Sequence, residues 1–503
     1  MNDTTPASPH DDAAAVGTTV RLSLVSHTNV GKTTLARTLL GRDIGEVRDE
    51  AHVTQEVERH TMIESPEGAR LELWDTPGFG DSVRLARRIA QAGNPLGWFL
   101  SEVWDRFRDR AFWASQKVVR HVLEQADVVL YLVNASEAPE DAGYLDAELR
   151  VLELAGKPAI VLLNQLGPPQ EPELEAAEVE RWRQRTQASP CVREVLALDA
   201  FARCWAQEGT LLEAVSSVIA NDEQRAAMER LRDAWWVRGQ ATWQVAMAVL
   251  AERLARAAQD RQVVASSGFM ARLKEVGAAL GLRREGSRTP REQAMRALAE
   301  RLDADIRAST ERLIRLHGLS GEAAGQVLMR LAEHFSVQQP VSEGKAAVWG
   351  GVLSGALAGL KADVLSGGLT MGGGLLAGGV LGALGAAGLA RGYNMLRGVD
   401  EPTLAWADAV LDELARSALL GYLAVAHYGR GRGDWQAWEH PEFWQDSVND
   451  VVEQRLELLH DLWDERQSLA AGELAARLEA WFSDACDVLL ARLYPEHRPL
   501  LPE

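Results

Sequence analysis

Cysteine is scarce in this chain. Cys191, Cys204 and Cys486 are the three cysteines among 503 residues, and they lie too far apart to show the spacing of a metal site. The first residues also lack the basic and then apolar stretch that marks a secretory signal. These absences argue against a secreted disulfide scaffold and favour a reducing, cytoplasmic compartment.

Positive charge is also in short supply. Lys and Arg number 53 against 72 Asp and Glu, which gives a net charge of −19. Nucleic-acid binding draws its affinity from clustered Lys and Arg, so an extended nucleic-acid surface is not expected, although local basic patches are compatible with this balance. The charged fraction of 25% and the hydrophobic fraction of 47% argue against wholesale disorder and against a polytopic membrane protein.

The composition changes along the chain and indicates several folding units, because 503 residues exceed what one hydrophobic core supports. Short β-rich runs alternate with helical stretches at first, a pattern typical of an α/β domain with a mostly parallel sheet. Ala, Leu, Arg and Glu then recur at helical periodicity, which predicts an all-α region. The expected order is a disordered leader (1–18), an α/β domain (19–220) with a helical insertion (82–125), a helical region (221–342), a glycine-rich apolar hairpin (343–398) and a C-terminal helical region (399–503).

A strand followed by a loop and a helix carries the first motif. The expected strand Val20–Ser26 leads into Ser-His-Thr-Asn-Val-Gly-Lys-Thr-Thr and a helical run, Leu35–Leu40. Backbone N–H groups at such a helix N-terminus bind phosphates. Lys32 is then expected to reach the β and γ oxygens, and the Thr33 hydroxyl to bind Mg²⁺. The nucleotide contacts predicted in this loop are Thr28, Asn29, Val30, Gly31, Lys32, Thr33 and Thr34.

A second motif, Asp75-Thr76-Pro77-Gly78, ends another expected strand, Leu71–Asp75. Asp75 is predicted to hold Mg²⁺ through water, and the Gly78 N–H to sense the γ-phosphate. Between the motifs, Thr54 is the candidate switch threonine that closes on Mg²⁺, with a solvated loop threonine as the alternative. Lys32, Thr54 and Gly78 are therefore the residues expected to act in hydrolysis.

These motifs resemble the Era and TrmE-like branch of the translation-factor-related GTPases, whose loop reads G-x-x-N-x-G-K-S/T. Asn29–Thr33 and Trp74–Phe79 carry the likeness, which covers residues 19–220. The resemblance implies a P-loop NTPase fold of the small G-protein kind, GTP or GDP as ligand and Mg²⁺ as cofactor. In some members the asparagine matching Asn29 helps to hold K⁺, so a K⁺ requirement is a further hypothesis. The remainder resembles a bacterial family in which an Era-like G domain precedes a C-terminal domain of unknown function.

Three positions depart from that family's pattern. Ser26 stands where the loop begins with glycine, and its Cβ is expected to restrict the turn. The run Asn164-Gln165-Leu166-Gly167 replaces N-K-x-D, so Asn164 and Gln165 remain base-site candidates while Gly167 offers guanine no carboxylate. Asp199 and Ala200 stand where the family's Ser-Ala loop approaches the base. Asp199 either supplies the missing carboxylate or is an ordinary loop or helix-capping residue.

The segment 346–390 is rich in glycine and poor in charge. Val364–Ala390 contains no charged side chain and is long enough to cross a bilayer core of about 30 Å. Gly351, Gly355 and Gly359 lie four residues apart and would form a helix face that permits close backbone approach, as in a glycine zipper. Because glycine weakens helix propensity and hydrophobicity, membrane association and a tightly packed soluble hairpin both stay open.

The leading hypothesis is a GTP-binding switch that relays its nucleotide state to the helical region and hydrolyses the β–γ phosphoanhydride bond. Hydrolysis is expected to be slow, because Phe79 stands where Ras-like proteins place a water-orienting glutamine. Alternatives are a ribosome- or RNA-associated Era-like GTPase and a nucleotide-sensing adaptor that does not hydrolyse. The expected partners are a guanine nucleotide, an unidentified protein and, through 346–390, the inner face of the cell membrane. Oligomerisation stays open.

Overall fold

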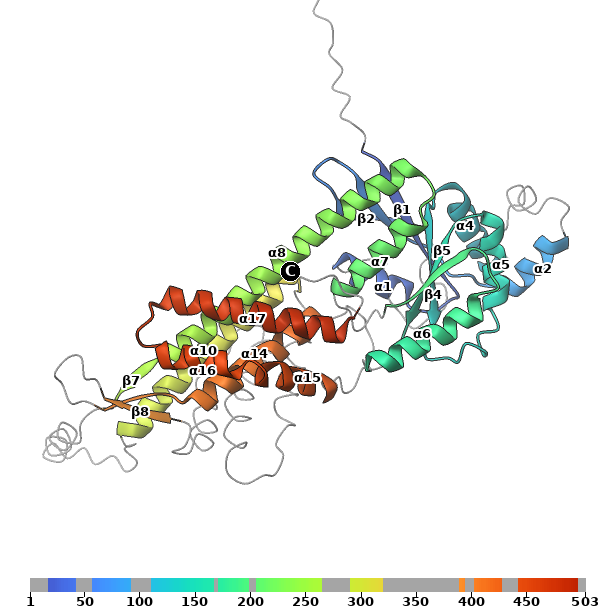
Figure 1. The fold of residues 1–503 in the computed structure, drawn as a ribbon. Coiled ribbons are helices and arrows are strands. Elements are labelled where there is room, and N and C mark those ends of the chain that lie inside the picture. The colour runs from blue at the N-terminus through green and yellow to red at the C-terminus, as the bar shows by residue number, and fades with distance from the viewer. Residues whose placement is uncertain are drawn as a thin grey trace, which may run out of the picture. The chain divides into compact units, whose positions relative to one another are not determined.

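The computed structural model describes residues 17–41, 57–91, 110–166, 171–198, 205–264, 290–319, 389–393, 402–427 and 442–495. These residues form two compact units (Figure 1). The first unit takes in the chain up to Arg238, apart from two short segments, and the second begins at Gly239. The first unit contains both sequence motifs.

A six-stranded sheet forms the centre of the first unit, in the order β2-β3-β1-β4-β5-β6. Only β2 runs antiparallel to its neighbour, and the other four pairings are parallel. The central strands are continuous apolar runs because helices cover both of their faces; Val128–Val133 is completely buried. The strands are β1 (Thr19–Ser26), β2 (Glu58–Glu64), β3 (Arg70–Asp75), β4 (Val128–Asn134), β5 (Ala159–Asn164) and β6 (Val192–Ala197).

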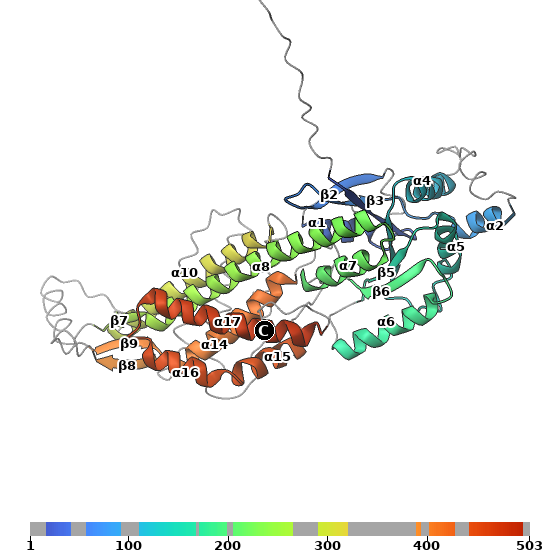
Figure 2. The ribbon, with the colours of Figure 1, turned by 45° about the horizontal axis from the view of Figure 1, so that its top comes forward.

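Helices lie on both sides of this sheet (Figures 1 and 2). One face is covered by α2 (Ser82–Gln91), α4 (Arg110–Glu124), α5 (Leu145–Ala155) and α6 (Pro172–Thr186), whose apolar side chains share one buried cluster with the strands. The other side carries α1 (Lys32–Leu40) and α7 (Trp205–Val218). Helices α2 and α4 stand at the two ends of the predicted insertion 82–125, and the residues between them lie outside the described chain. The expected α/β fold with a mostly parallel sheet is confirmed.

The second unit is mainly helical, as expected. Three tryptophans, Trp444, Trp463 and Trp481, are buried in its core. Helix α8 contributes residues to both units, with its division at Arg238 and Gly239. The helices are α8 (Asp222–Gln259), α10 (Pro290–Leu316), α14 (Asp408–Ala426), α15 (Glu442–Glu453), α16 (Leu456–Glu465) and α17 (Ala471–Leu493).

A small sheet corrects the all-α prediction for the second unit. Three short strands, β7 (Arg261–Val263), β8 (Leu389–Tyr393) and β9 (Pro402–Trp406), pair antiparallel in the order β7-β9-β8. Strand β7 lies far from β8 and β9 in sequence, so its pairing with β9 depends on the tertiary fold. Runs of three to five residues are also too short for a periodic signal in the sequence.

The glycine-rich prediction for 346–390 falls almost wholly outside the described residues. Its last two residues, Leu389 and Ala390, pair with β9, so the predicted helical hairpin does not continue through Ala390. Backbone pairing with a neighbouring strand prevails there over a helical pattern that glycine already weakens. Within the described ranges, no helix has the length and apolar character needed to cross a membrane.

Candidate nucleotide-binding site

The loop between β1 and α1 contains two residues in the left-handed conformation. Asn29 has a φ of 64°, and Gly31, the N-cap of α1, has a φ of 92°. Glycine is needed at position 31 for a second reason, because a Cβ there would lie 2.8 Å from Asn164 Nδ2. Left-handed residues at a helix N-terminus favour the concave run of N–H groups that binds anions.

Thr33 and Asp75 meet where α1 begins and β3 ends. The Thr33 hydroxyl donates a hydrogen bond of 2.6 Å to Asp75 Oδ2. Asp75 is buried, and its Oδ1 has no hydrogen-bond partner among the described residues. Burial raises the pKa of Asp75 from its ordinary 3.8 to about 6, against the opposing effects of the Thr33 hydrogen bond and the Lys32 charge. A hydroxyl beside a partly unsatisfied carboxylate fits the oxygen ligands that Mg²⁺ takes.

The side chain of Lys32 is buried beside the loop. Its Nζ donates to Ser26 Oγ at 3.0 Å and to the His27 carbonyl oxygen at 3.5 Å. Burial lowers the pKa of Lys32, while the charges of Asp75 and then Glu148 act to raise it. Ser26 was expected to restrict the turn, but β1 continues through it and its hydroxyl becomes a contact for Lys32.

The second motif packs directly on the loop. A Cβ at Gly78 would lie 3.0 Å from both Lys32 Nζ and Thr28 Cα, so glycine allows this close approach. The Phe79 N–H donates to the Ser26 carbonyl oxygen at 2.9 Å. The Phe79 ring is completely buried in the core between the sheet and its helices. A ring in that position has no group that can orient water at the site.

The end of β5 also reaches the loop. The buried Asn164 donates from Nδ2 to the Val30 carbonyl oxygen at 2.7 Å. Gln165 follows in the left-handed conformation, with a φ of 61°. Its Nε2 would lie 3.7 Å from a Cβ at Gly31, so Gln165 extends over the loop.

The structure thus brings together the predicted loop residues Thr28–Thr34, the second motif and the base-site candidates Asn164 and Gln165. The switch threonine Thr54 and the base-site candidates Asp199 and Ala200 lie outside the described residues, as does Gly167. The roles assigned to these residues, and K⁺ binding at Asn29, stay predictions.

Sequence reasoning missed one set of contacts at this site. His27, which the sequence does not single out, is 2.7 Å from Glu148 Oε1 through its Nδ1 and stacks on Tyr144. Glu148 stands in the first turns of α5, among alternating acidic and apolar residues. An acidic residue at a buried position of an amphipathic helix is the signal that could have identified it.

Family models match both parts of the chain. The model described as 50S ribosome-binding GTPase matches residues 21–165. The model described as domain of unknown function DUF3482 matches residues 185–477. No curated protein gives a significant match to the chain as a whole.

Solved structures similar to this chain include two of Era. One is Era in complex with MgGDPNP and nucleotides 1506–1542 of 16S ribosomal RNA, with 16% identity, coverage of 45% of this chain and 67% of that chain, and a TM-score of 0.28. The second is an Aquifex aeolicus Era variant bound to GDP and AlF4−, with 18% identity, coverage of 45% and 68%, and a TM-score of 0.27. A bacterial selenocysteine-specific elongation factor, EF-Sec, has 13% identity, coverage of 43% and 29%, and a TM-score of 0.25. Values this low carry no argument about function.

The family matches do not coincide with the division seen in the fold, because the second model begins at residue 185, within the first unit, which extends to Arg238. The GTPase model spans the strands and loops that build the candidate site, from β1 to the end of β5. The second model extends over more than half of the 503 residues. The chain therefore belongs to the DUF3482 family and carries, ahead of the domain of unknown function, a GTPase domain of the 50S ribosome-binding GTPase family.

Proposed function

We propose that the first unit binds a guanine nucleotide with Mg²⁺, hydrolyses GTP slowly and relays its nucleotide state to the second unit. The observation that supports this most directly is the meeting of three groups at one place. Thr33 and Asp75 share a hydrogen bond of 2.6 Å, and the buried Lys32 lies beside them at the start of α1. Phosphate binding and divalent-metal binding require these residue types together.

Each residue has a distinct task in this proposal. The main-chain N–H groups of the loop bind phosphate oxygens, and Lys32 supplies a positive charge that is already desolvated. Thr33 and Asp75 hold the cation, Thr33 directly and Asp75 through water. When bound, Mg²⁺ supplies positive charge that stabilises the charge developing on the transferred phosphoryl group. The Gly78 N–H responds to the γ-phosphate, a role supported by the close approach of Gly78 to Lys32.

Slow hydrolysis follows from the position of Phe79. A water-orienting side chain is expected at this point in Ras-like proteins, and the Phe79 ring is instead completely buried. At this position the first unit therefore offers no side chain that orients the attacking water, and its described residues contribute positioning and electrostatic stabilisation. Single-turnover hydrolysis of GTP by the purified chain separates a slow hydrolase from an adaptor that binds without hydrolysing.

Nucleotide binding itself is tested by titrating GDP and a non-hydrolysable GTP analogue with Mg²⁺ into the full chain. Lys32→Ala should weaken binding by at least about a hundredfold, because a charge-assisted contact to phosphate is lost in a desolvated site. Lys117→Ala is the matched control, since Lys117 lies on α4 with its ammonium 4.3 Å from the centre of the Trp113 ring. Equal binding by wild type and Lys32→Ala, or none by wild type, contradicts the proposal.

The relay is supported by helix α8, which belongs to the first unit up to Arg238 and to the second from Gly239. If nucleotide state is passed along the chain, hydrogen exchange in residues 239–259 should differ between the GDP-bound and GTP-analogue-bound protein.

We further propose that the nucleotide state controls contact with a membrane through residues 346–390. Flotation with anionic vesicles tests it, and a chain that stays at the bottom of the gradient in both nucleotide states contradicts it.

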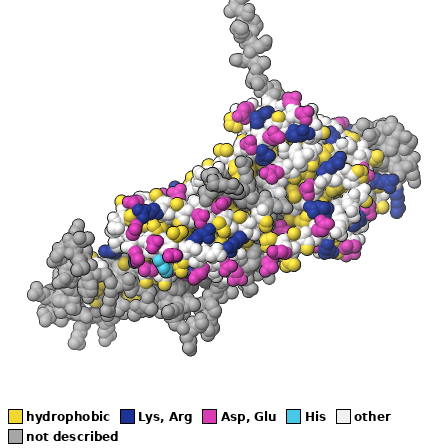
Figure 3. All heavy atoms as spheres, viewed as in Figure 1, with side chains coloured by type: hydrophobic (Ala, Val, Ile, Leu, Met, Phe, Trp, Pro, Cys, Tyr) yellow, Lys and Arg dark blue, Asp and Glu magenta, His cyan; other side chains and the backbone are white. Residues whose placement is uncertain are grey.

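Association with the ribosome is a second candidate, favoured by the description of the GTPase family as 50S ribosome-binding. The net charge of −19 counts against it, and acidic and basic side chains are intermingled on the described residues of the face shown in Figure 3. Co-sedimentation with ribosomal subunits in the presence of each nucleotide decides between a ribosomal and a membrane output.

A further inference from the structure

A buried glutamate lies behind the phosphate loop and is joined to it by a hydrogen bond. Glu148 projects from α5 and is completely buried. Its Oε1 accepts from His27 Nδ1 at 2.7 Å, and its Oε2 accepts from the Tyr131 hydroxyl at 2.7 Å. Because a carboxylate only accepts, the hydrogen is on Nδ1 of His27. The carboxylate thus ties the first residue of the loop to strand β4.

The His27 ring is held from a second direction. Tyr144, the N-cap residue of α5, stacks on it with ring centroids 4.6 Å apart and ring planes at 13°. Tyr144 and Glu148 are four residues apart, so one turn of α5 contacts both the face and the edge of the imidazole. We call His27, Tyr131, Tyr144 and Glu148 the α5 clasp.

The α5 clasp acts at the point where β1 becomes the loop. Ser26, next to His27, accepts the Phe79 N–H with its carbonyl and the Lys32 ammonium with its hydroxyl. His27 itself pairs with Phe79 in a parallel bridge. The orientation of His27 therefore affects both contacts that hold the second motif and Lys32 against the loop.

The same glutamate also influences Lys32 electrostatically. After Asp75, the charge of Glu148 is the next cause that opposes the lowering of the Lys32 pKa by burial. The α5 clasp also links the loop to the helix that follows the second motif, because Leu85 of α2 and Leu149 of α5 lie in the same buried cluster.

We propose that Glu148 is a positioning residue for the phosphate loop, acting through His27, and that the α5 clasp sets the loop's affinity for nucleotide phosphates. This inference rests on the proposed function, since it concerns the same loop. A loop that binds phosphates through main-chain N–H groups binds tightly only if those groups are already in place. Charge-assisted hydrogen bonds such as that between His27 and Glu148 are strong enough to hold them.

Glu148→Gln tests the proposal, because it removes the charge and keeps the size of the side chain. GDP and a non-hydrolysable GTP analogue should each bind about tenfold more weakly to the full-length variant, the scale of a hydrogen bond to a charged group. Glu208→Gln is the matched control. Glu208 is a buried glutamate on α7 that accepts from Trp235 Nε1 at 3.1 Å, so its loss should lower the thermal midpoint and leave nucleotide affinity within about twofold.

A double-mutant cycle tests whether the effect passes through His27. His27→Phe keeps a ring for Tyr144 and loses the Nδ1 hydrogen. If Glu148 acts through His27, the double variant should bind no more weakly than either single variant. Additive losses contradict the proposal, as does Glu148→Gln binding that is unchanged or tighter than wild type. A wild-type protein that binds no nucleotide overturns the proposed function, and this inference with it.

Discussion

Asp75 combines a buried carboxylate with one oxygen that has no hydrogen-bond partner among the described residues. Its pKa is raised from 3.8 to about 6, so between these values the folded protein binds more protons than the unfolded chain. Stability therefore falls as pH rises through that window, by about 1.4 kcal/mol per pKa unit, or roughly 1–3 kcal/mol in all. The ligand-free site is thus destabilising at neutral pH.

Asp75→Asn should remove this cost. An amide oxygen can still accept from Thr33, so the ligand-free variant should unfold a few degrees higher at pH 7, at about 2–4 °C for each kcal/mol. The same variant should lose Mg²⁺-dependent nucleotide binding, because the carboxylate ligand is gone. Thermal midpoints at pH 7 and pH 4 check the reasoning. The gain should shrink at pH 4, and a variant equally destabilised at both values contradicts it.

We expect the base preference of the site to reflect Gly167, which stands where the N-K-x-D pattern has an aspartate. Without that carboxylate, the wild type should discriminate weakly among GTP, ITP and XTP. Gly167→Asp should raise the preference for GTP over XTP by about tenfold or more, since a charged acceptor then pairs with the guanine N1 and N2 donors. Competition binding with the three nucleotides measures this. Strong discrimination by the wild type would point to another acceptor, with Asp199→Ala as the next variant.

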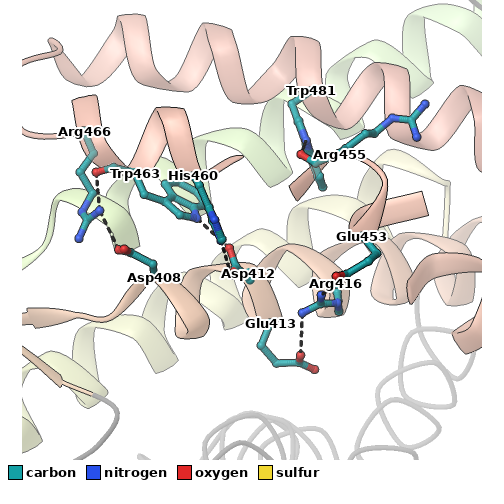
Figure 4. A network of polar contacts seen from close by, with 10 residues as sticks. All are labelled: Asp408, Asp412, Glu413, Arg416, Glu453, Arg455, His460, Trp463, Arg466 and Trp481. Carbon is teal, nitrogen blue, oxygen red and sulfur yellow. Dashed lines mark hydrogen bonds and ion pairs between the residues drawn. The ribbon is translucent and has the colours of Figure 1, made fainter. Parts of the chain in front are cut away.

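At the scale of elements, helices α14 and α16 are joined by a buried carboxylate (Figure 4). Asp412 accepts from Trp463 Nε1 at 2.8 Å and from His460 Nε2 at 3.1 Å. Asp412→Ala should destabilise the second unit by about 1–3 kcal/mol, because the buried Trp463 N–H loses its partner. Asp464→Ala on the exposed side of α16 is the control and should change little. Thermal unfolding followed by tryptophan fluorescence distinguishes the two.

Strands could be predicted from the sequence where an apolar run ends in polar motif residues. The strands ending at Ser26 and Asp75 appear where expected, because each buried run and the chemistry at its end indicate the same boundary. The β7-β9-β8 sheet was not predictable, since its strands are short and β7, far from the other two in sequence, joins β9 through tertiary pairing.

The motifs of the candidate site could be predicted from the sequence, but the contacts that hold the loop in place could not. A fixed spacing signals a motif, so Lys32, Thr33 and Asp75 could be assigned from sequence alone. The contact between His27 and Glu148 joins residues that are 121 positions apart in the sequence. No local sequence pattern indicates a contact between residues so far apart along the chain.

At the scale of the whole molecule, each unit holds a buried histidine that remains neutral in the fold. In the first unit, His121 is 2.8 Å from Ser23 Oγ through its Nε2, and burial lowers its pKa to about 4. In the second unit, His427 Nδ1 donates to the Leu423 carbonyl oxygen at 2.7 Å, and burial again lowers the pKa to about 4. Neither histidine therefore takes up a proton in the folded state until the pH falls to about 4.

These two histidines should for this reason make each unit lose stability in acid, while in the first unit Asp75, with its pKa of about 6, acts in the opposite direction. Between pH 6.5 and about 4 the unfolded chain binds a proton that the folded histidine does not, so the contribution of each histidine to stability is complete above 6.5 and decreases as pH falls, by up to about 3 kcal/mol for each histidine. His427→Phe, which keeps a ring beside Trp444, should flatten this pH dependence in the second unit, and His121→Gln should flatten it in the first. His460→Gln, at a half-exposed side chain, is the control. Unfolding midpoints measured from pH 7 to pH 4.5 test this prediction. If the midpoint depends on pH in the same way in all three variants and the wild type, groups other than these two histidines cause the loss of stability in acid.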